Sequence, residues 1–370
     1  QRDGYLVPAS GGEPQKITAL QNFLTSLDWL PDGKGIVYAI FGGNEEGVGL
    51  WKMALPNGTP ERLTGRERNI LGVVSDRHRN RLIYITGNYD IDIWRMELQA
   101  GKAGQQPPTR FIHSTKVENT VMYSQDGKTI AFNSMRSGYD HLWFCDADGQ
   151  NPRQITVENK RVGGSTWSPD GRQIAFSLRL DDKSSIYVMN AEGRQKVRLS
   201  DGKANDSYPI WSHDGKWIYF RSDRTGQREL WKMPAQGGEP LPVLKRELYK
   251  YAESWDGKFL IYAKGQMPPG LWRLDLATGE ESLLTKVHNA GYWWSWDVSP
   301  RGIYFASCET PLRAMVEFYD FATGKVSLVA NVRTPFPAPL PGLSVSPDER
   351  WLCYLQQDLE GDLLLMENVE

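Results

Sequence analysis

The sequence has few of the residues that build metal centres and disulfide frameworks. It contains three cysteines and five histidines in 370 residues, without the short spacings that mark a zinc knuckle or a disulfide-rich scaffold. The cysteines Cys145, Cys308 and Cys353 are therefore expected to be buried free thiols. A bridge between Cys308 and Cys353, which lie on adjacent predicted units, is the open alternative. We predict no metal and no cofactor.

Long apolar runs and an excess of one charge are also absent. No run approaches the ~18–20 apolar residues of a membrane span. The formal net charge of −2 gives no reason to expect nucleic acid or an anionic membrane as a partner. The chain begins at Gln1 with neither an initiator methionine nor a signal peptide. We therefore expect a mature secreted protein or a domain of a larger one.

Motifs of known catalytic centres are missing as well. The sequence has no G-x-S-x-G nucleophile elbow. It also has no glycine-rich phosphate loop and no H-E-x-x-H zinc motif. The histidines are scattered, at positions 78, 113, 141, 213 and 288. These absences predict a protein that is not an enzyme and has no catalytic residues.

What the sequence does contain is one short phrase repeated along its whole length. The clearest copies are W-S-P-D-G-R at 167–172 and W-S-H-D-G-K at 211–216. Acidic residues occupy the turn position at 32, 76, 126, 170, 214, 256 and 348, with Arg301 in the remaining slot. The steps between these positions are 44, 50, 44, 44, 42, 45 and 47 residues. A period of about 40–45 residues is typical of propeller blades.

Each repeat is predicted to form four antiparallel strands, the content of one blade. In the fifth unit, 208–212 and 217–221 are aromatic-rich segments on either side of the turn at 213–216. The turn acid is expected to cap backbone N–H groups rather than bind calcium, which needs about six to eight oxygens. Buried aromatic residues are predicted six positions after the acid, at Tyr38, Phe132, Phe176, Phe220, Tyr262 and Tyr354.

The predicted fold is all-β: a single closed β-propeller of eight four-stranded blades over residues 1–370, with seven blades as the alternative. We predict that an N-terminal strand at 14–18 completes the C-terminal blade and so removes an exposed sheet edge. Residues 5–8 and 363–366 both fit the third strand of that blade, and 363–366 is favoured. The predicted blades are 23–64, 69–113, 117–156, 162–200, 205–245, 248–285, 289–329 and 340–370 plus 14–18.

The predicted binding site lies at the mouth of the central channel. The loops that lead into the first strands meet at one end of a propeller, and here they are aromatic and polar. Rigid scaffolds often carry function on such loops, and Tyr, Trp and Arg are common anchors. The alternative is that these aromatic side chains only pack the channel wall. The predicted ligand- or partner-binding residues are Tyr208, Tyr251, His288, Tyr292, Trp293, Arg333 and Phe336.

The repeated phrase, followed by I-x-F/Y and L-W/Y-x-M segments, resembles the TolB-type, WD-repeat-like propeller repeat. Such propellers occur in the periplasmic protein TolB, in dipeptidyl-peptidase and prolyl-oligopeptidase enzymes beside a separate hydrolase domain, and in membrane-anchored bacterial regulators. Oligogalacturonate lyases also use this propeller but hold a metal with clustered histidines.

The ending at 362–370 and the abrupt start resemble the propeller of the membrane-anchored regulators, which carry an N-terminal winged-helix DNA-binding domain. The resemblance implies a non-catalytic sensor domain of a bacterial transcriptional regulator, located in the periplasm or elsewhere outside the cytoplasm. Its partner would be a protein, a peptide or a small molecule at the channel mouth, with no nucleic-acid or membrane contact by this domain. The alternatives are the propeller of a peptidase or a polysaccharide lyase, and a TolB-like periplasmic scaffold.

Overall fold

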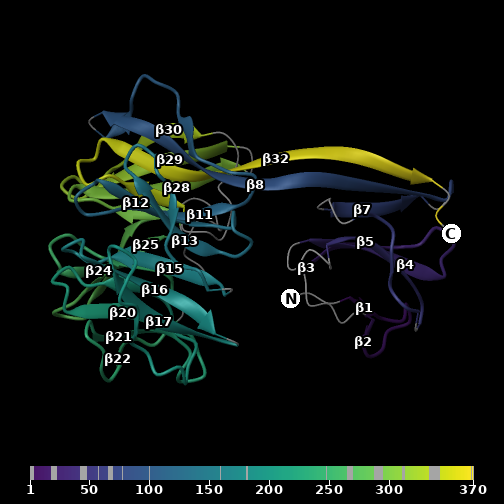
Figure 1. Cartoon of the computed structure of the whole chain (residues 1–370), viewed down its shortest axis with the longest axis horizontal. Coiled ribbons are helices and arrows are strands. Elements are labelled where there is room, and N and C mark those ends of the chain that lie inside the picture. Colours follow the sequence, from purple (N-terminus) through teal and green to yellow (C-terminus); the bar gives the residue numbers. More distant parts are fainter. Residues whose placement is uncertain are drawn as a thin grey trace. The chain divides into compact units, whose positions relative to one another are not determined.

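The described part of the chain consists of β-strands and connecting turns. Every regular element in it is a strand (Figure 1), which confirms the all-β class. In that part, no helix has the length and apolar character needed to cross a membrane. The computed structural model describes residues 4–17, 23–41, 48–56, 58–65, 70–76, 78–99, 101–158, 160–180, 182–246, 248–264, 270–286, 295–310, 313–332, 342–367 and 369.

The chain forms two compact units. The larger unit runs from Asp90 to Gln357, and the smaller one combines Gln1–Tyr89 with Asp358–Glu370. Two long strands, β8 (Arg81–Gln99) and β32 (Trp351–Glu367), contribute residues to both units. The assignment of the whole chain to one domain stays a prediction.

Five sheets of the larger unit are four-stranded, and each is built from four consecutive antiparallel strands. This is the blade unit that the repeats predict. The sheets are β11 (Glu118–Tyr123), β12 (Thr129–Ser134), β13 (His141–Asp146) and β14 (Arg153–Gln154); β15 (Val162–Trp167), β16 (Gln173–Leu180), β17 (Lys183–Asn190) and β18 (Val197–Arg198); β19 (Ser207–Trp211), β20 (Trp217–Ser222), β21 (Glu229–Pro234) and β22 (Leu241–Leu244); β23 (Leu248–Glu253), β24 (Phe259–Lys264), β25 (Leu271–Asp275) and β26 (Glu281–Thr285); β27 (Trp296–Val298), β28 (Gly302–Thr310), β29 (Arg313–Asp320) and β30 (Val326–Val332).

A further sheet combines strands from distant parts of the sequence. Its order is β10 (Thr109–Ile112), β8, β32 and β31 (Leu343–Val345), and β7 (Ile70–Asp76) and β9 (Lys102–Ala103) also pair with β8. Within the larger unit this sheet brings β31 beside the first strands of two other sheets. The Tyr123 N–H donates to Ser344 Oγ over 3.3 Å, and the Val345 N–H donates to Asp297 Oδ2 over 2.9 Å.

The smaller unit holds another four-stranded sheet and a short hairpin. The hairpin joins β1 (Tyr5–Leu6) to β2 (Gln15–Lys16), and its turn is closed by a 2.9 Å bond from the Gly11 N–H to the Pro8 carbonyl. The four-stranded sheet consists of β3 (Phe23–Trp29), β4 (Gly35–Phe41), β5 (Gly49–Ala54) and β6 (Glu61–Arg62).

Within the described residues, the strand pairing predicted to close the ring is wrong, and the closed ring of eight blades stays a prediction. The strand at 14–18 was expected to complete the C-terminal blade, but β2 pairs with β1 instead. The C-terminal strand β32 pairs with β31 and with β8. The segment 363–366 continues β32, and 5–6 forms the first strand of the N-terminal hairpin. The physical reason is that the backbone of Gln15 and Lys16 already pairs with Leu6 and Tyr5 in the N-terminal hairpin.

One hydrogen-bonded turn recurs in the described sheets, between the first and second strands. In its fifth copy, the Ser212 hydroxyl donates to Asp214 Oδ1 over 2.7 Å and accepts the Trp217 N–H over 2.9 Å. Asp214 Oδ1 also accepts the Lys216 N–H over 3.0 Å. These hydrogen bonds, the Lys216 N–H first, lower the pKa of Asp214. The same Ser–Asp bond forms at Ser124–Asp126, Ser168–Asp170, Ser254–Asp256 and Ser346–Asp348.

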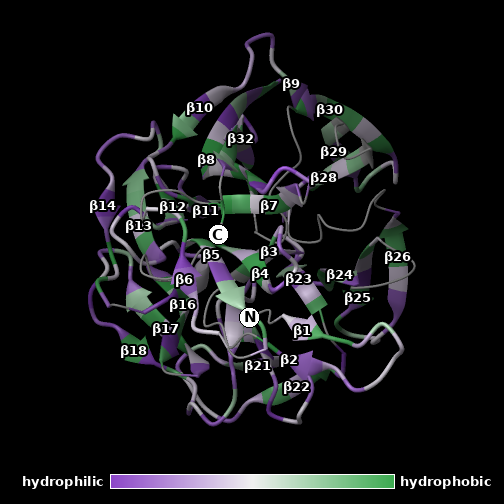
Figure 2. Cartoon of the chain, turned by 90° about the vertical axis from the view of Figure 1, so that its right-hand side faces the viewer, coloured by the Kyte–Doolittle hydropathy of each residue, from purple (hydrophilic) through white to green (hydrophobic). Residues whose placement is uncertain are grey.

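The predicted buried aromatic residues are confirmed. All six side chains that follow the turn acid by six positions are at most 2% exposed. They come from second strands, and four of them lie in clusters with residues of neighbouring sheets: Phe176, Phe220, Tyr262 and Tyr354. Phe220, for example, packs with Ile186 and Val188 of β17. Figure 2 shows hydrophobic residues on strands of the described sheets. In second strands the burial is nearly continuous, at 130–134 of β12 and 174–178 of β16, as expected for strands with neighbours on both faces.

All three cysteines are buried and free, as expected. The Cys353 sulfur lies 3.2 Å from the hydroxyl of Tyr123, and burial raises the pKa of the Cys353 thiol to about 12. A thiol with such a pKa stays protonated and unreactive at neutral pH.

The turn makes a direct prediction about stability. The substitution Ser212→Ala removes the acceptor of the Trp217 N–H and one donor to Asp214, so the free energy of unfolding should fall by about 1–3 kcal/mol. Ser327→Ala, at an exposed position of β30, is the control and should change stability by less than ~0.5 kcal/mol. Urea denaturation measures both. Equal stability of the two variants would show that the turn does not hold the strands in register.

Candidate functional site

The innermost strands of the larger unit surround a cavity of about 320 Å³. Residues of β11, β15, β19, β23, β27 and β31 all line it. A second cavity of about 180 Å³ adjoins it, because Thr166, Trp167 and Trp255 line both. Ligand sites are commonly cavities of about this size with mainly apolar walls and a few polar groups.

Irregular backbone in four neighbouring first strands directs residues into this cavity. The pairing register shifts in β11, β15, β19 and β23, each time against the second strand of the same sheet. Thr120, Gly164, Tyr208 and Lys250 lie at these irregularities, and all four line the cavity. A β-bulge bends its strand and re-aims a side chain, and bulges are common beside functional sites.

Tyr208 is held in an unusual conformation. Its φ is +55°, a region that bulky residues rarely adopt. Its carbonyl oxygen accepts a hydrogen bond from the Tyr251 hydroxyl, and the Arg221 guanidinium lies 4.5 Å from the centre of its ring. Gly164 permits the close packing, because a Cβ atom there would lie 2.8 Å from the Tyr208 Cα. The neighbouring sheets therefore fix the position of Tyr208.

Lys250 brings a cationic group into the cavity lining. Its ammonium donates a hydrogen bond to the Trp296 carbonyl oxygen and lies 5.0 Å from the centre of the Trp296 ring. Burial lowers the pKa of Lys250 to about 8, and the charge of Asp297 opposes this shift. At neutral pH the group is therefore charged, and its surroundings make a further negative charge favourable.

Asp297 is fixed by backbone amides of two strands. Its carboxylate accepts the Val298 N–H over 3.0 Å and the Val345 N–H over 2.9 Å. Burial raises the pKa of Asp297, while the Lys250 charge and these hydrogen bonds oppose the rise. Because its oxygens bind backbone amides of β27 and β31, Asp297 holds these strands together and leaves Lys250 donors for a ligand.

Aromatic rings form much of the remaining wall. The Trp255 indole N–H donates to the Val298 carbonyl over 2.9 Å, which holds that ring against the neighbouring strand. Such rings give an apolar ligand large contact area at low cost in rotamer entropy. The aromatic residues that line the cavity are Trp167, Tyr208, Trp211, Tyr249, Tyr251 and Trp255.

Two of the predicted binding residues, Tyr208 and Tyr251, come together at this cavity. Tyr251 is only 2% exposed and packs in a hydrophobic cluster with Tyr219 and Leu230 of the preceding sheet. The assignment of these residues to a binding site stays a prediction. The other five predicted residues lie outside the described residues: His288, Tyr292, Trp293, Arg333 and Phe336.

Sequence reasoning did not select Lys250 and Asp297. Lys250 stands between two tyrosines in a segment that the sequence marks as a channel loop. Asp297 follows a tryptophan in a degenerate repeat. Lys250 and Asp297 come close together because β23 packs near β27. The spacing of residues along the sequence does not predict this contact.

Two family models match the chain. The model for the N-terminal region of dipeptidyl peptidase IV matches residues 13–208, more than half of the chain. The model for the TolB beta propeller domain matches residues 159–307.

Solved structures with similar folds include proteins of several kinds. TolB from Acinetobacter baumannii is 16% identical with a TM-score of 0.52, over 91% of this chain and 81% of that one. A chain of a nidogen/laminin complex is 13% identical with a TM-score of 0.55, over 74% and 98%. A puromycin-hydrolysing peptidase of Mycobacterium tuberculosis is 15% identical with a TM-score of 0.49, over 86% and 55%. Identities this low establish similarity of fold alone.

These matches correct one prediction and support part of another. The TolB-type resemblance is confirmed at the level of the propeller domain. The prediction that the chain is not an enzyme is wrong, because residues 13–208 match the N-terminal region of a peptidase. The nucleophile and zinc motifs are missing from these 370 residues. Their absence does not exclude that the propeller is part of an enzyme. The transcriptional-regulator context and the location outside the cytoplasm stay predictions.

The Tyr251 hydroxyl offers a test of how Tyr208 is held. Tyr251→Phe removes a buried hydrogen bond to the Tyr208 carbonyl, and the free energy of unfolding should fall by about 1–2 kcal/mol. Tyr139→Phe, at an exposed ring, should leave stability within ~0.5 kcal/mol of wild type. Chemical denaturation measures both variants, and a Tyr251→Phe protein as stable as wild type would contradict this role.

Proposed function

The chain belongs to the family of the dipeptidyl peptidase IV N-terminal region, and from this premise we propose that it is the propeller part of a peptidase-type enzyme. In this proposal the propeller binds a peptide in its central cavity, while hydrolysis takes place in a separate domain. The observation that carries the ligand assignment is that a lysine, Lys250, lines a cavity whose other walls are largely aromatic.

A peptide with a free carboxylate fits the chemistry of this cavity. The ammonium of Lys250 has three donors, one of which binds the Trp296 carbonyl among the described contacts. A carboxylate near the remaining donors would form a charge-assisted hydrogen bond in a partly desolvated site, where such bonds are strong. The aromatic rings would take up the apolar side chains of the ligand. The nidogen structure, solved as a complex with laminin, is compatible with a polypeptide as a ligand of such a fold.

The first test compares peptides that end in a carboxylate with the same peptides ending in an amide. We expect calorimetric titration to give at least ~10-fold tighter binding of the carboxylate form, the equivalent of about 1.4 kcal/mol. Lys250→Met should remove this preference. Lys258→Met is the control, because Lys258 lies on an exposed turn and pairs with Asp256. Equal affinity for both peptide forms in the wild type would contradict the proposed role of Lys250.

The pH dependence of binding follows from the same residue. Because the Lys250 pKa is about 8, the ammonium is present below that pH and is lost above it. The affinity for the carboxylate peptide should therefore be constant from pH 6 to 7 and fall as pH rises above ~8. A bound carboxylate raises the Lys250 pKa, so the fall begins near the pKa of the free protein and levels off near the higher pKa of the complex. The amide peptide should show no such fall, and a parallel fall for both would contradict the assignment.

Catalysis needs a separate experiment. The native full-length protein should release products from a library of short peptides, measured by mass spectrometry. A full-length protein that binds these peptides but hydrolyses none would contradict the peptidase assignment and leave the cavity assignment in place.

A further inference from the structure

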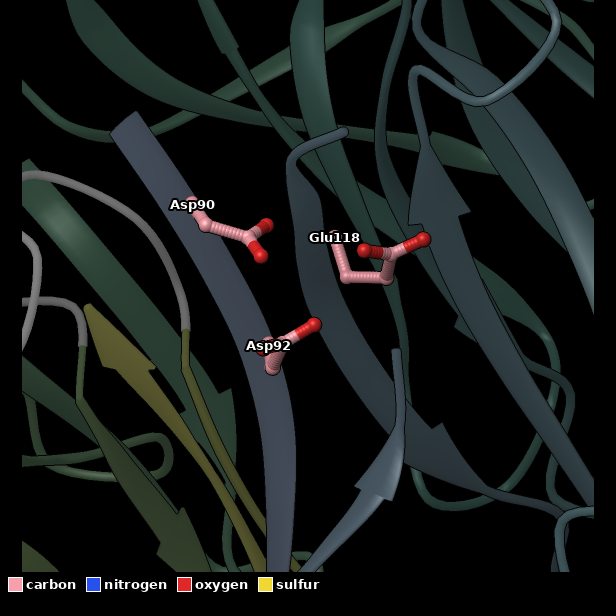
Figure 3. Close-up of side chains that lie close together, drawn as sticks. All are labelled: Asp90, Asp92 and Glu118. Carbon is pink, nitrogen blue, oxygen red and sulfur yellow. The ribbon is translucent and has the colours of Figure 1, made fainter. Parts of the chain in front are cut away.

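Three carboxylates meet between two sheets of the larger unit, away from the cavity. Asp90 and Asp92 lie two positions apart on β8, so their side chains project from the same face of that strand. Glu118 begins β11, the first strand of the next sheet in the sequence. Figure 3 shows the three side chains directed toward one another, and one oxygen of each lies within 4.8 Å of the others.

Two of these side chains present buried oxygens without a partner. Asp92 and Glu118 are both 0% exposed. Among the contacts of the described residues, Asp92 Oδ1 and Glu118 Oε2 have no hydrogen-bond partner. A buried, ionised oxygen without a partner is costly, so these two oxygens require either a proton or a cation.

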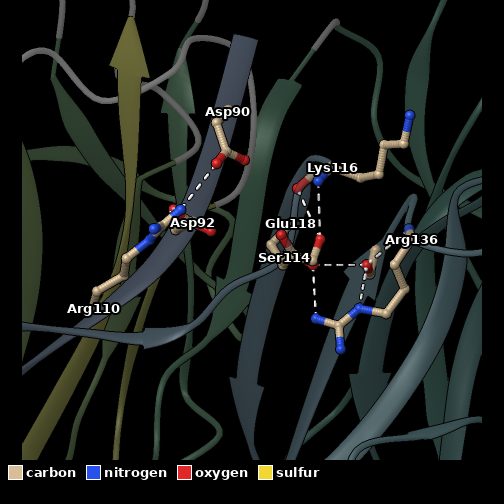
Figure 4. Close-up of polar contacts among 8 residues, drawn as sticks. Asp90, Asp92, Arg110, Ser114, Lys116, Glu118 and Arg136 are labelled. Carbon is tan, nitrogen blue, oxygen red and sulfur yellow. Dashed lines mark hydrogen bonds and ion pairs between the residues drawn. The ribbon is translucent and has the colours of Figure 1, made fainter. Parts of the chain in front are cut away.

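The opposite oxygens are bound by arginines, which orient the carboxylates. Arg110 binds Asp92 Oδ2 through Nε over 2.6 Å and Asp90 Oδ2 through Nη2 over 2.9 Å. Arg136 binds Glu118 Oε1 over 2.7 Å, and Ser114 and Ser134 add further bonds to the same oxygen (Figure 4). Asp92 and Glu118 therefore each bind a guanidinium through one oxygen, and the other oxygen has no partner among the described contacts.

The charges of the cluster do not balance. Three carboxylates face two guanidinium groups, so the fully ionised cluster carries a net charge of −1 (+2 − 3). Burial, and next the charge of Asp90, raises the pKa of Asp92 to about 6, and burial also raises the pKa of Glu118. A divalent cation would change the net charge of the cluster from −1 to +1 and would supply partners for the oxygens that have none.

A position in another sheet of the larger unit corresponds to Glu118 but has a single buried acid in place of the cluster. Asp206 is also 0% exposed and pairs with Arg224 over 3.1 Å, and Arg224 binds Ser222 as Arg136 binds Ser134. The place of Asp92 is taken there by Ser185, which binds Arg198. One buried acid paired with arginine is thus a feature of the repeat, and at Asp206 too one oxygen, Oδ2, has no partner among the described contacts. Among the described residues, Glu118 is the one such acid that has two further carboxylates beside it, those of Asp90 and Asp92.

We propose that Asp90, Asp92 and Glu118 bind one Ca²⁺ ion between β8 and β11. All three donors are carboxylate oxygens, which favour hard cations over zinc or copper. One oxygen from each acid leaves the rest of the coordination shell to water. Calcium accepts such irregular geometry more readily than magnesium, which demands a near-ideal octahedron. The bound ion would join two sheets of the larger unit and stabilise them.

Calorimetry and thermal unfolding of the chelator-treated chain test this proposal. One Ca²⁺ should bind per chain, and saturating Ca²⁺ should raise the melting temperature by at least ~2 °C, because a ligand that binds only the folded state stabilises it. Asp92→Asn and Glu118→Gln should weaken Ca²⁺ binding at least ~10-fold, as expected when a carboxylate ligand is lost.

The matched control is Asp206→Asn, which changes a buried, arginine-paired acid outside the cluster. It should lower stability equally with and without Ca²⁺ and leave Ca²⁺ affinity unchanged. If Asp92→Asn fails to fold, Asp90→Asn replaces it, because the Asp90 side chain is 20% exposed. That variant should also bind Ca²⁺ at least ~10-fold more weakly.

Three results would overturn the proposal. The first is that wild type binds no Ca²⁺ at millimolar concentration, which would mean that the cluster holds a proton instead. The second is that Asp92→Asn, or Asp90→Asn in its place, binds Ca²⁺ as tightly as wild type. The third is that Mg²⁺ binds more tightly than Ca²⁺, which would rule out the calcium assignment.

Discussion

The hydrogen-bonded turn between first and second strands is the constraint on which the described sheets depend. A serine hydroxyl, an aspartate oxygen and two backbone amides form one small network, as at Ser212, Asp214, Lys216 and Trp217. Because this network sets the pairing register, it also sets the face to which each side chain points. The aromatic residue six positions after the acid is thereby directed between neighbouring sheets, where Phe176 and Phe220 are fully buried.

At the end of the first strand that lies away from this turn, the pairing with the second strand becomes irregular in four sheets. The four shifts of register lie in β11, β15, β19 and β23, at the cavity lining. The turn keeps one end of each sheet regular, and the bulge changes which side chains reach the centre. Tyr208 and Lys250 enter the cavity lining in this way, and contacts from neighbouring sheets hold both residues. The family model that matches more than half of the chain describes the N-terminal region of dipeptidyl peptidase IV.

The sequence predicts the parts of the fold that depend on local chemistry. The turn acids, the buried aromatic residues and the four-stranded unit all follow from short spacings, and the structure has them. The pairing of β32 with β8 joins segments more than 250 residues apart in the sequence, and no local pattern specifies that choice. The predicted closure through 14–18 is wrong for this reason.

The same limit applies to the sites. Tyr208 and Tyr251 were found because their loops are aromatic, whereas Lys250 and Asp297 come together only through packing between sheets. The cluster of Asp90, Asp92 and Glu118 likewise combines residues from two sheets, and no motif joins them in the sequence. The prediction that the chain is not an enzyme is wrong because it rested on missing catalytic motifs. A search for such motifs tests only the residues of this chain.

A crystal structure of the protein with a bound carboxylate peptide tests the central claim most directly. The account predicts that the peptide occupies the cavity lined by β11, β15, β19, β23, β27 and β31. Its carboxylate should lie within hydrogen-bonding distance of Lys250 Nζ, about 2.7–2.9 Å for a charge-assisted bond. A peptide bound elsewhere on the protein, with the cavity occupied only by water, would contradict the account.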